Sequence, residues 1–277
     1  MVSKTKTMLA DLNPFYGLIS VSGLDAATFL QGQITADLRT ITSTQPGFSA
    51  YCNTKGRIRA LFRIFLYQEC YFLHLPIDVL PSALATLKKY ARFSKVKLED
   101  VSDQWQRVGI WLAQADLNAI DLTNLKDIIL LPLPSPEPYQ RFELIGPPSI
   151  VKPLWDQLVE IENAVISDFD AWNCLDIQAG IPEIWPETME QFLPHSLNLP
   201  ALGAVSFNKG CYCGQEIVAR MEYRANAIHK LFNIAVTDPE NIPLPGASLY
   251  AENGSSEIIG TVVSASQTEI LGVKGKQ

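Results

Sequence analysis

The sequence has few histidines, few cysteines and no long apolar run. Its 277 residues include 3 His and 5 Cys, and no uncharged apolar stretch approaches the ~18 residues that a membrane-spanning helix needs. The first ten residues hold two lysines but soon lead to Asp11 and Pro14, so a secretory signal peptide is not expected. An odd number of cysteines, mostly far apart, is typical of free thiols in a reducing compartment. We therefore expect a cytoplasmic protein without a membrane segment.

Positive charge is also in the minority. The chain has 22 Lys and Arg against 29 Asp and Glu, a formal net charge of −7, which argues against nonspecific binding of nucleic acid over the whole surface. One stretch departs from this average. Residues 52–97 carry a net charge of +7, which leaves −14 for the rest of the chain. This basic segment is the place to look for an anionic ligand or partner.

Apolar residues recur with strand-like spacing in some segments and helix-like spacing in others, and they make up 47% of the chain. The predicted fold class is therefore α+β. Residues 48–52 and 57–67 are predicted strands of a hairpin whose turn contains Asn53 and Gly56. Residues 78–93 are predicted to form an amphipathic helix. Four prolines within residues 131–138 predict a surface loop.

The densest group of reactive side chains is the string Lys-Gly-Cys-Tyr-Cys-Gly-Gln-Glu over residues 209–216. Good helix formers follow it, so both thiols would lie just before a helix N-terminus and beside Lys209. The helix dipole and the nearby cation favour the thiolate there. The alternative is that Cys211 and Cys213 are small apolar fillers of a turn. A zinc site would need four ligands, which the pattern does not supply, so no metal site is predicted.

This string resembles the Lys-Gly-Cys-Tyr-Thr-Gly-Gln-Glu motif of the YgfZ family, folate-binding proteins related to the T-protein (aminomethyltransferase) of the glycine cleavage system. Three other segments also resemble that family: Phe-Leu-Gln-Gly-Gln-Ile-Thr-Ala-Asp at 29–37, Thr-Lys-Gly-Arg at 54–57 and Ile-Gln-Ala-Gly-Ile-Pro at 177–182. The resemblance spans roughly residues 15–235.

The resemblance implies a three-lobed protein with a central channel that binds tetrahydrofolate. Two intertwined ferredoxin-like α/β units would form a folate-binding region over residues 1–230. One unit would be mainly 46–165, and the other 1–45 with 166–230. Residues 231–277 would form a small C-terminal β-barrel-like module, shorter than is usual in the family.

The family motif also assigns roles to individual residues. Cys211 matches the family's essential cysteine and is the expected reactive thiol, whereas Cys213 stands where the family has Thr. Gln178 replaces a glutamate that contacts the pterin in T-proteins, so weaker pterin binding is expected. The other expected folate-binding residues are Lys209, Gly210, Tyr212, Gly214, Gln215, Glu216, Arg57 and Arg59.

The function that the resemblance implies is support of iron–sulfur enzymes, including those that methylthiolate tRNA. The partners would be folate and iron–sulfur enzymes or their assembly proteins. A folate-dependent one-carbon transferase is an alternative, but the acidic pair that T-proteins carry after the hairpin glycine is absent, since Ala60 and Leu61 stand there. A further alternative is a tRNA-binding module built on segment 52–97, whose arginines at 57, 59 and 63 alternate along one strand face. A merely solvated strand face explains that alternation equally well.

Overall fold

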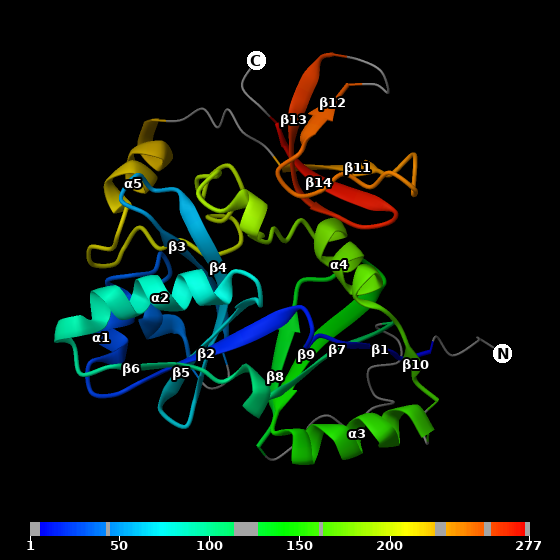
Figure 1. The fold of residues 1–277 in the computed structure, drawn as a ribbon, viewed down its shortest axis with the longest axis horizontal. Helices are drawn as coiled ribbons and strands as arrows, with labels where there is room; N and C mark the ends of the chain where they lie inside the picture. Colours follow the sequence, from blue (N-terminus) through cyan, green and yellow to red (C-terminus); the bar gives the residue numbers. More distant parts are fainter. Residues whose placement is uncertain are drawn as a thin grey trace.

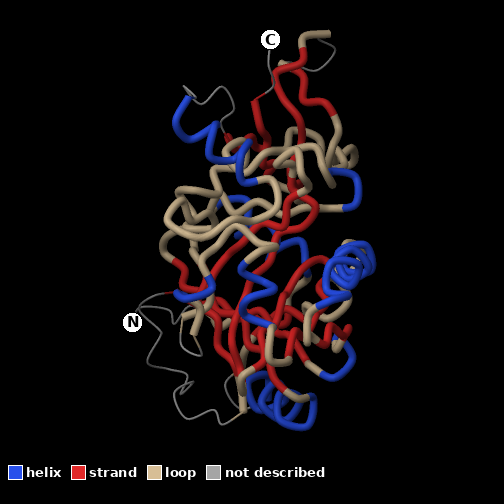
Figure 2. The backbone as a smooth tube through the Cα atoms, turned by 90° about the vertical axis from the view of Figure 1, so that its left-hand side faces the viewer, coloured by secondary structure: helices blue, strands red, loops and turns tan. Residues whose placement is uncertain are grey.

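A computed structural model describes residues 6–42, 45–113, 127–160, 163–224, 231–251 and 256–274. Over these residues the chain forms three β-sheets, two of them side by side and the third above them (Figure 1). From the side, the strands occupy the interior and the helices lie outside, and a broad tract of loops covers one face (Figure 2). The longest such segment, residues 179–214, holds only one short 3-10 helix, η5 (Pro186–Thr188).

The first sheet is antiparallel, in the order β3-β4-β5-β2-β6. Its strands are β2 (Tyr16–Ser22), β3 (Gly47–Cys52), β4 (Ile58–Tyr67), β5 (Cys70–Pro76) and β6 (Lys97–Asp100). Its helices are α1 (Ala26–Gln31), η1 (Leu38–Thr40), α2 (Leu80–Tyr90) and η2 (Ala91–Phe93). The predicted hairpin and the predicted helix over 78–93 are therefore confirmed. In the hairpin turn, the side chain of Asn53 accepts hydrogen bonds from the backbone N–H groups of Lys55 and Arg57.

The second sheet has the order β10-β1-β7-β9-β8. Its strands are β1 (Met8–Asp11), β7 (Gln106–Ala113), β8 (Ile129–Leu133), β9 (Tyr139–Gly146) and β10 (Val165–Ile166), with η3 (Ser102–Gln104) before it and α3 (Pro148–Glu160) on one face. The proline-rich segment was predicted to be loop throughout, which is wrong for its first residues. Pro132 lies in β8, and β8 is an edge strand, where a residue without an N–H group is tolerated.

The third sheet is antiparallel and has the order β11-β14-β13-β12. Its strands are β11 (Leu231–Ala235), β12 (Ser248–Tyr250), β13 (Ile258–Ala265) and β14 (Glu269–Lys274). Helix α4 (Phe169–Gln178) packs against β13 and β14 and joins this sheet to the other two. The last helix, α5 (Gln215–Arg224), lies beside the β3–β4 hairpin (Figure 1).

The first two sheets do not follow the expected division of residues 1–230 into 46–165 and 1–45 with 166–230, whereas the strands of the third sheet all lie within residues 231–274. Strand β2 precedes residue 46, yet it pairs with β5, which follows it. Strand β10 ends at Ile166 and pairs with β1 near the start of the chain. The first two sheets thus each contain strands from both sides of a predicted boundary, because strand pairing is decided by contacts between distant segments.

Candidate functional site

The cysteine motif and the β3–β4 turn are packed together through two glycines. Gly214, just before α5, has a φ of +82°, and a Cβ atom there would lie 2.4 Å from the carbonyl oxygen of Asn53. Gly56, in the turn, has a φ of +72°, and a Cβ atom there would lie 3.0 Å from Cβ of Ile217. Glycine is the residue that fits this left-handed backbone at such close approach. Two segments far apart in the sequence therefore form one unit.

Residues 34–36 complete this unit. The Nζ atom of Lys209 donates hydrogen bonds to the carbonyl oxygens of Ile34 and Ala36, both at 2.7 Å. The hydroxyl of Thr35 donates to the carbonyl of Ala204 at 2.6 Å. Lys209 is only 9% exposed, and burial lowers its pKa to about 8. Its ammonium group ties the start of the cysteine motif to the segment after α1.

The two motif thiols lie in different environments, and both are free. Cys211 is exposed, whereas Cys213 is half-buried. Burial raises the pKa of the Cys213 thiol, and the Arg59 guanidinium only partly opposes this effect. The prediction that the thiolate is favoured is therefore wrong for Cys213. Buried Cys52 lies nearby, and burial raises the pKa of its thiol as well.

Arg57, just before β4, and Arg59, near the start of that strand, contact the loop that follows η5. Arg59 forms an ion pair with Glu190, with Nε 2.6 Å from Oε1, and Arg57 donates to the carbonyl of Gln191. Backbone hydrogen bonds run alongside, since the N–H group of Glu190 donates to the carbonyl of Ile58 at 2.7 Å. These guanidinium groups hold residues 190–192 against the strand.

Arg63 does not share an exposed cationic face with them. It is 4% exposed, and Leu61 between it and Arg59 is 7% exposed. That face of β4 turns from solvent into the protein interior along its length. The predicted cationic strand face is therefore wrong beyond Arg59.

Arg63 belongs to a buried cluster of charged residues at the junction of the first two sheets and α4. This cluster was not predicted from the sequence. The Nη2 atom of Arg63 lies 3.1 Å from Oδ2 of Asp176, and its Nη1 atom lies 3.3 Å from Oε2 of Glu143. Arg141 approaches the other oxygen of Asp176 at 2.5 Å, and His74 Nε2 lies 2.7 Å from Glu143. Burial lowers the pKa of His74, while His74 and Arg63 hold the pKa of Glu143 below its usual value despite its burial. The ion pairs of this cluster join two guanidinium groups to two carboxylates. Arg107 and Glu183 also interact electrostatically with the cluster.

Charged residues within otherwise apolar strands were the sequence signal for this cluster. Arg141 and Glu143 alternate on β9, and Arg63 interrupts the apolar run of β4. Buried charges are paired because an unpaired buried charge is costly. That rule predicts partners for them, but the sequence does not say which residues those partners are.

Gln178, the expected pterin contact, ends α4 and is exposed. Ile177 before it is fully buried in a hydrophobic cluster that also contains Cys52 and Val218. The same core therefore supports the end of α4 and the cysteine motif. No hydrogen bond joins the Gln178 side chain to the motif among the described residues.

The remaining residues that were expected to bind folate flank Cys211 in the sequence. Tyr212 is buried, and its ring centroid lies 5.2 Å from Nζ of Lys209. The N–H group of Gln215 donates to the carbonyl of Tyr212 at 3.2 Å, while Glu216 is exposed. Gly210 lines a surface pocket of about 420 Å³ together with Gln31, Arg39 and other residues of α1, η1 and the motif. Gly210, which lines this pocket, directly precedes Cys211 in the chain.

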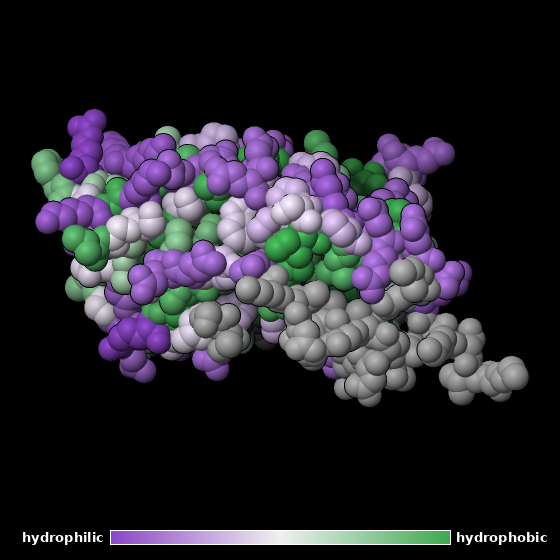
Figure 3. Space-filling model, turned by 90° about the horizontal axis from the view of Figure 1, so that it is seen from below, coloured by the Kyte–Doolittle hydropathy of each residue, from purple (hydrophilic) through white to green (hydrophobic). Residues whose placement is uncertain are grey.

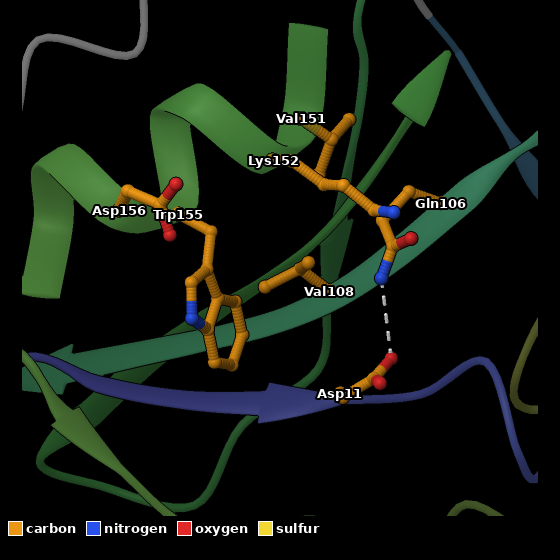
Figure 4. Close-up of a pocket in the computed structure, with 7 residues that line it drawn as sticks. All are labelled: Asp11, Gln106, Val108, Val151, Lys152, Trp155 and Asp156. Atoms are coloured by element: carbon orange, nitrogen blue, oxygen red, sulfur yellow. Dashed lines mark hydrogen bonds between the residues drawn. The ribbon is translucent and has the colours of Figure 1, made fainter. Parts of the chain in front are cut away.

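A different pocket, of about 320 Å³, lies between α3 and strands β1 and β7 (Figure 4). Trp155 and Lys152 line it from the helix, and Asp11 lines it from β1. None of the expected site residues borders it.

No group of three His, Cys, Asp or Glu side chains placed to hold a metal ion occurs within the described residues. In the same part of the chain, no helix has the length and apolar character to cross a membrane.

No protein-family model matches the chain. The chain is 33% identical over 266 residues to the tRNA-modifying protein YgfZ of Sodalis glossinidius, which covers 92% of this chain and 79% of that protein. The YgfZ protein of Yersinia pestis (strain Pestoides F) is 33% identical over 269 residues, covering 91% and 78%. An uncharacterized protein of Haemophilus influenzae is 33% identical over 256 residues, covering 90% and 81%.

The fold is similar to that of the glycine cleavage system aminomethyltransferase T from Bartonella henselae. The TM-score is 0.74 over 98% of this chain and 79% of that chain, with 16% sequence identity. The predicted α+β class and its likeness to that aminomethyltransferase fold are thereby confirmed.

Proposed function

This chain belongs to the YgfZ family of tRNA-modifying proteins, and from that premise we propose that it is a cytoplasmic, tetrahydrofolate-binding accessory protein. It supports the assembly or repair of iron–sulfur enzymes, including methylthiotransferases that act on tRNA, and Cys211 is its reactive thiol. The folate-binding region lies within residues 1–230.

The observation that carries this proposal is the setting of Cys211. Its thiol is exposed on a loop that is anchored on both sides, by Lys209 before it and by the contact of Gly214 with Gly56 after it. A reactive group on a rigid loop keeps its orientation toward a ligand. A surface pocket is lined by Gly210, the residue that precedes Cys211 in the chain.

Tetrahydrofolate fits the groups present. Gln178 is exposed, so its amide oxygen is accessible to the N–H donors of a pterin. The pocket beside Gly210 has a volume of about 420 Å³ and is lined by Arg39, whose guanidinium already pairs with Asp37 at 2.5 Å, so a carboxylate of the folate tail would share it with Asp37. When bound, tetrahydrofolate supplies a carrier for one-carbon units.

Aminomethyl transfer is the weaker candidate. Ala60 and Leu61 replace the acidic pair of the T-proteins, and both are buried among apolar side chains. No carboxylate stands at these positions to assist chemistry at the folate nitrogen. Turnover of a methylamine-type donor with tetrahydrofolate would restore this candidate.

The proposal is tested by titrating the protein with tetrahydrofolate and by assaying support of an iron–sulfur enzyme in cells that lack the protein. We expect wild type to bind folate, Gln178→Glu to bind it more tightly, and Cys211→Ala to bind it while losing support of the enzyme. Cys70→Ala, at a half-buried cysteine outside the motif, is the matched control and should retain support. Full support by Cys211→Ala would refute the role of the thiol, and absence of folate binding would refute the cofactor.

A further inference from the structure

Exposed hydrophobic side chains that the core does not use lie at the end of α2, in η2 and in the turn before α1. Phe93 is 101% exposed, Leu24 87% and Tyr90 47%. The inward face of α2 packs through Leu80, Ala83 and Leu87. The next three residues, Lys88 to Tyr90, are exposed. The end of this helix forms one extremity of the molecule (Figure 1).

Backbone contacts bring Leu24 to the same corner. The N–H group of Lys95 donates to Oδ2 of Asp25 at 2.7 Å, and the N–H group of Asp25 donates to the carbonyl of Lys95 at 3.4 Å. The turn that carries Leu24 is therefore paired with the segment that follows Phe93. We call Leu24, Lys88, Lys89, Tyr90, Arg92, Phe93 and Lys95 the Phe93 corner.

The Phe93 corner is strongly basic in an acidic protein. Residues 79–98 contain five Lys or Arg and no Asp or Glu, against a net charge of −7 for the chain. Lys88, Lys89, Arg92 and Lys95 are exposed, and none of them forms an ion pair with another described residue. Seen from below, this end of the molecule shows hydrophobic groups standing among hydrophilic ones (Figure 3).

We propose that the Phe93 corner is a docking surface for unpaired nucleotides of RNA. Exposed aromatic rings stack on bases without regard to sequence, and flanking cations neutralise the phosphates. Phe93 and Tyr90 supply the rings, and the four unpaired cations supply the charge. This charge complementarity favours a polyanion with π-faces over a protein partner.

The corner lies close to the proposed site. Leu24 precedes α1, and Gln31 at the other end of α1 lines the pocket beside Gly210. A helix of six residues spans about 9 Å, so RNA bound at the corner reaches the pocket lined by Gln31 and Gly210 within a few nucleotides. The inference names the partner of the proposed function, and only this link to the pocket rests on that function. RNA binding itself is measured without folate.

The test uses the full-length protein and a fluorescently labelled single-stranded oligouridine, with binding followed by anisotropy at several salt concentrations. Phe93→Ala should weaken binding about ten-fold, in line with the loss of one stacked base. The triple variant Lys88→Gln, Lys89→Gln, Arg92→Gln should lower the slope of log affinity against log salt by about 2, at about 0.7 per lost phosphate contact.

Two matched controls share the chemistry but lie elsewhere. Lys152→Gln removes an exposed cation from α3, and Tyr250→Ala removes a half-exposed ring from the third sheet. Neither should change the affinity. Equal losses in the controls, unchanged binding by Phe93→Ala, or no binding at low salt would overturn the proposal. Binding to vesicles of anionic lipid without binding to oligouridine would overturn it too.

The two proposals fail separately. Phe93→Ala should keep wild-type affinity for tetrahydrofolate, because the side chain of Phe93 is fully exposed and lies outside the residues expected to bind folate. Loss of folate binding in wild type would leave the oligouridine result standing. Loss of oligouridine binding would leave the folate titration standing.

Discussion

Gly214 and Gly56 meet through their backbones, so that a Cβ atom on Gly214 would lie 2.9 Å from the Cα atom of Gly56. This contact joins the loop of Cys211 to a hairpin turn formed much earlier in the chain. The orientation of the exposed thiol is therefore set by the turn as well as by its own sequence neighbours.

Gly214→Ala should destabilise the protein and loosen the cysteine loop. A non-glycine residue held at a φ of +82° costs about 1–3 kcal/mol, and the backbone atoms of Asn53 and Gly56 leave no room for the methyl group. We expect a lower free energy of unfolding in urea denaturation. We also expect faster alkylation of Cys213, which the same loop keeps half-buried.

Gly210→Ala is the control for this substitution. A Cβ atom at Gly210 would meet nothing within 4 Å, so we expect a change within about 0.5 kcal/mol, as for most surface substitutions. Equal destabilisation by both variants would contradict the importance of the Gly56–Gly214 contact.

Cys211 should react with iodoacetamide well before the other motif cysteine. Its thiol is exposed, while burial both covers Cys213 and raises its pKa. Exposure and thiolate fraction therefore both work against Cys213, so we expect Cys211 to be alkylated first. Peptide mass spectrometry over time measures both rates, with buried Cys52 as an internal standard that stays unmodified. Equal rates would show that the loop is not ordered as described.

Arg63→Met should strongly destabilise the fold. The variant leaves the carboxylates of Asp176 and Glu143 without the guanidinium that joins them, and breaking a buried ion pair typically costs about 3–5 kcal/mol. Urea denaturation measures the loss. Arg59→Gln removes a partly exposed ion pair with Glu190 and should cost at most about 1 kcal/mol. A loss for Arg63→Met no larger than this would argue against a structural role of the buried cluster.

Glu183 should make the protein less stable as pH rises from about 5 to 8. Burial raises the pKa of its carboxyl from 4.5 to about 8. Between these values the folded protein holds a proton that the unfolded chain releases, so the free energy of unfolding falls as pH rises. In Glu183→Gln the amide stays neutral, and the fall should be smaller. Thermal denaturation of both proteins across this range provides the comparison.

His74 acts in the opposite direction, because burial lowers its pKa and favours unfolding at acidic pH. It is present in both proteins, so the difference between their pH profiles isolates Glu183. Parallel profiles would show that this carboxyl titrates normally.

Local features of the fold were predictable from the sequence because they depend on neighbours along the chain. Asn53 and Gly56 marked the turn between β3 and β4, and the helix formers after Gly214 marked α5. The cysteine motif also indicated the family, and the structure places its exposed thiol before that helix. These signals act over a few residues, where backbone preference decides.

The tertiary structure alone decided which distant residues meet. The alternation of Arg57, Arg59 and Arg63 fixed a shared strand face, but whether that face meets solvent depends on what packs over it. Asp176 and Glu143 cover one end of it, so Arg63 lies in a buried cluster while Arg59 stays at the edge. Likewise the sequence determined that Gly56 and Gly214 are glycines, and only folding showed that their freedom from a side chain lets two segments touch. Burial and contact are properties of the packed chain, because they depend on partners that the local sequence does not specify.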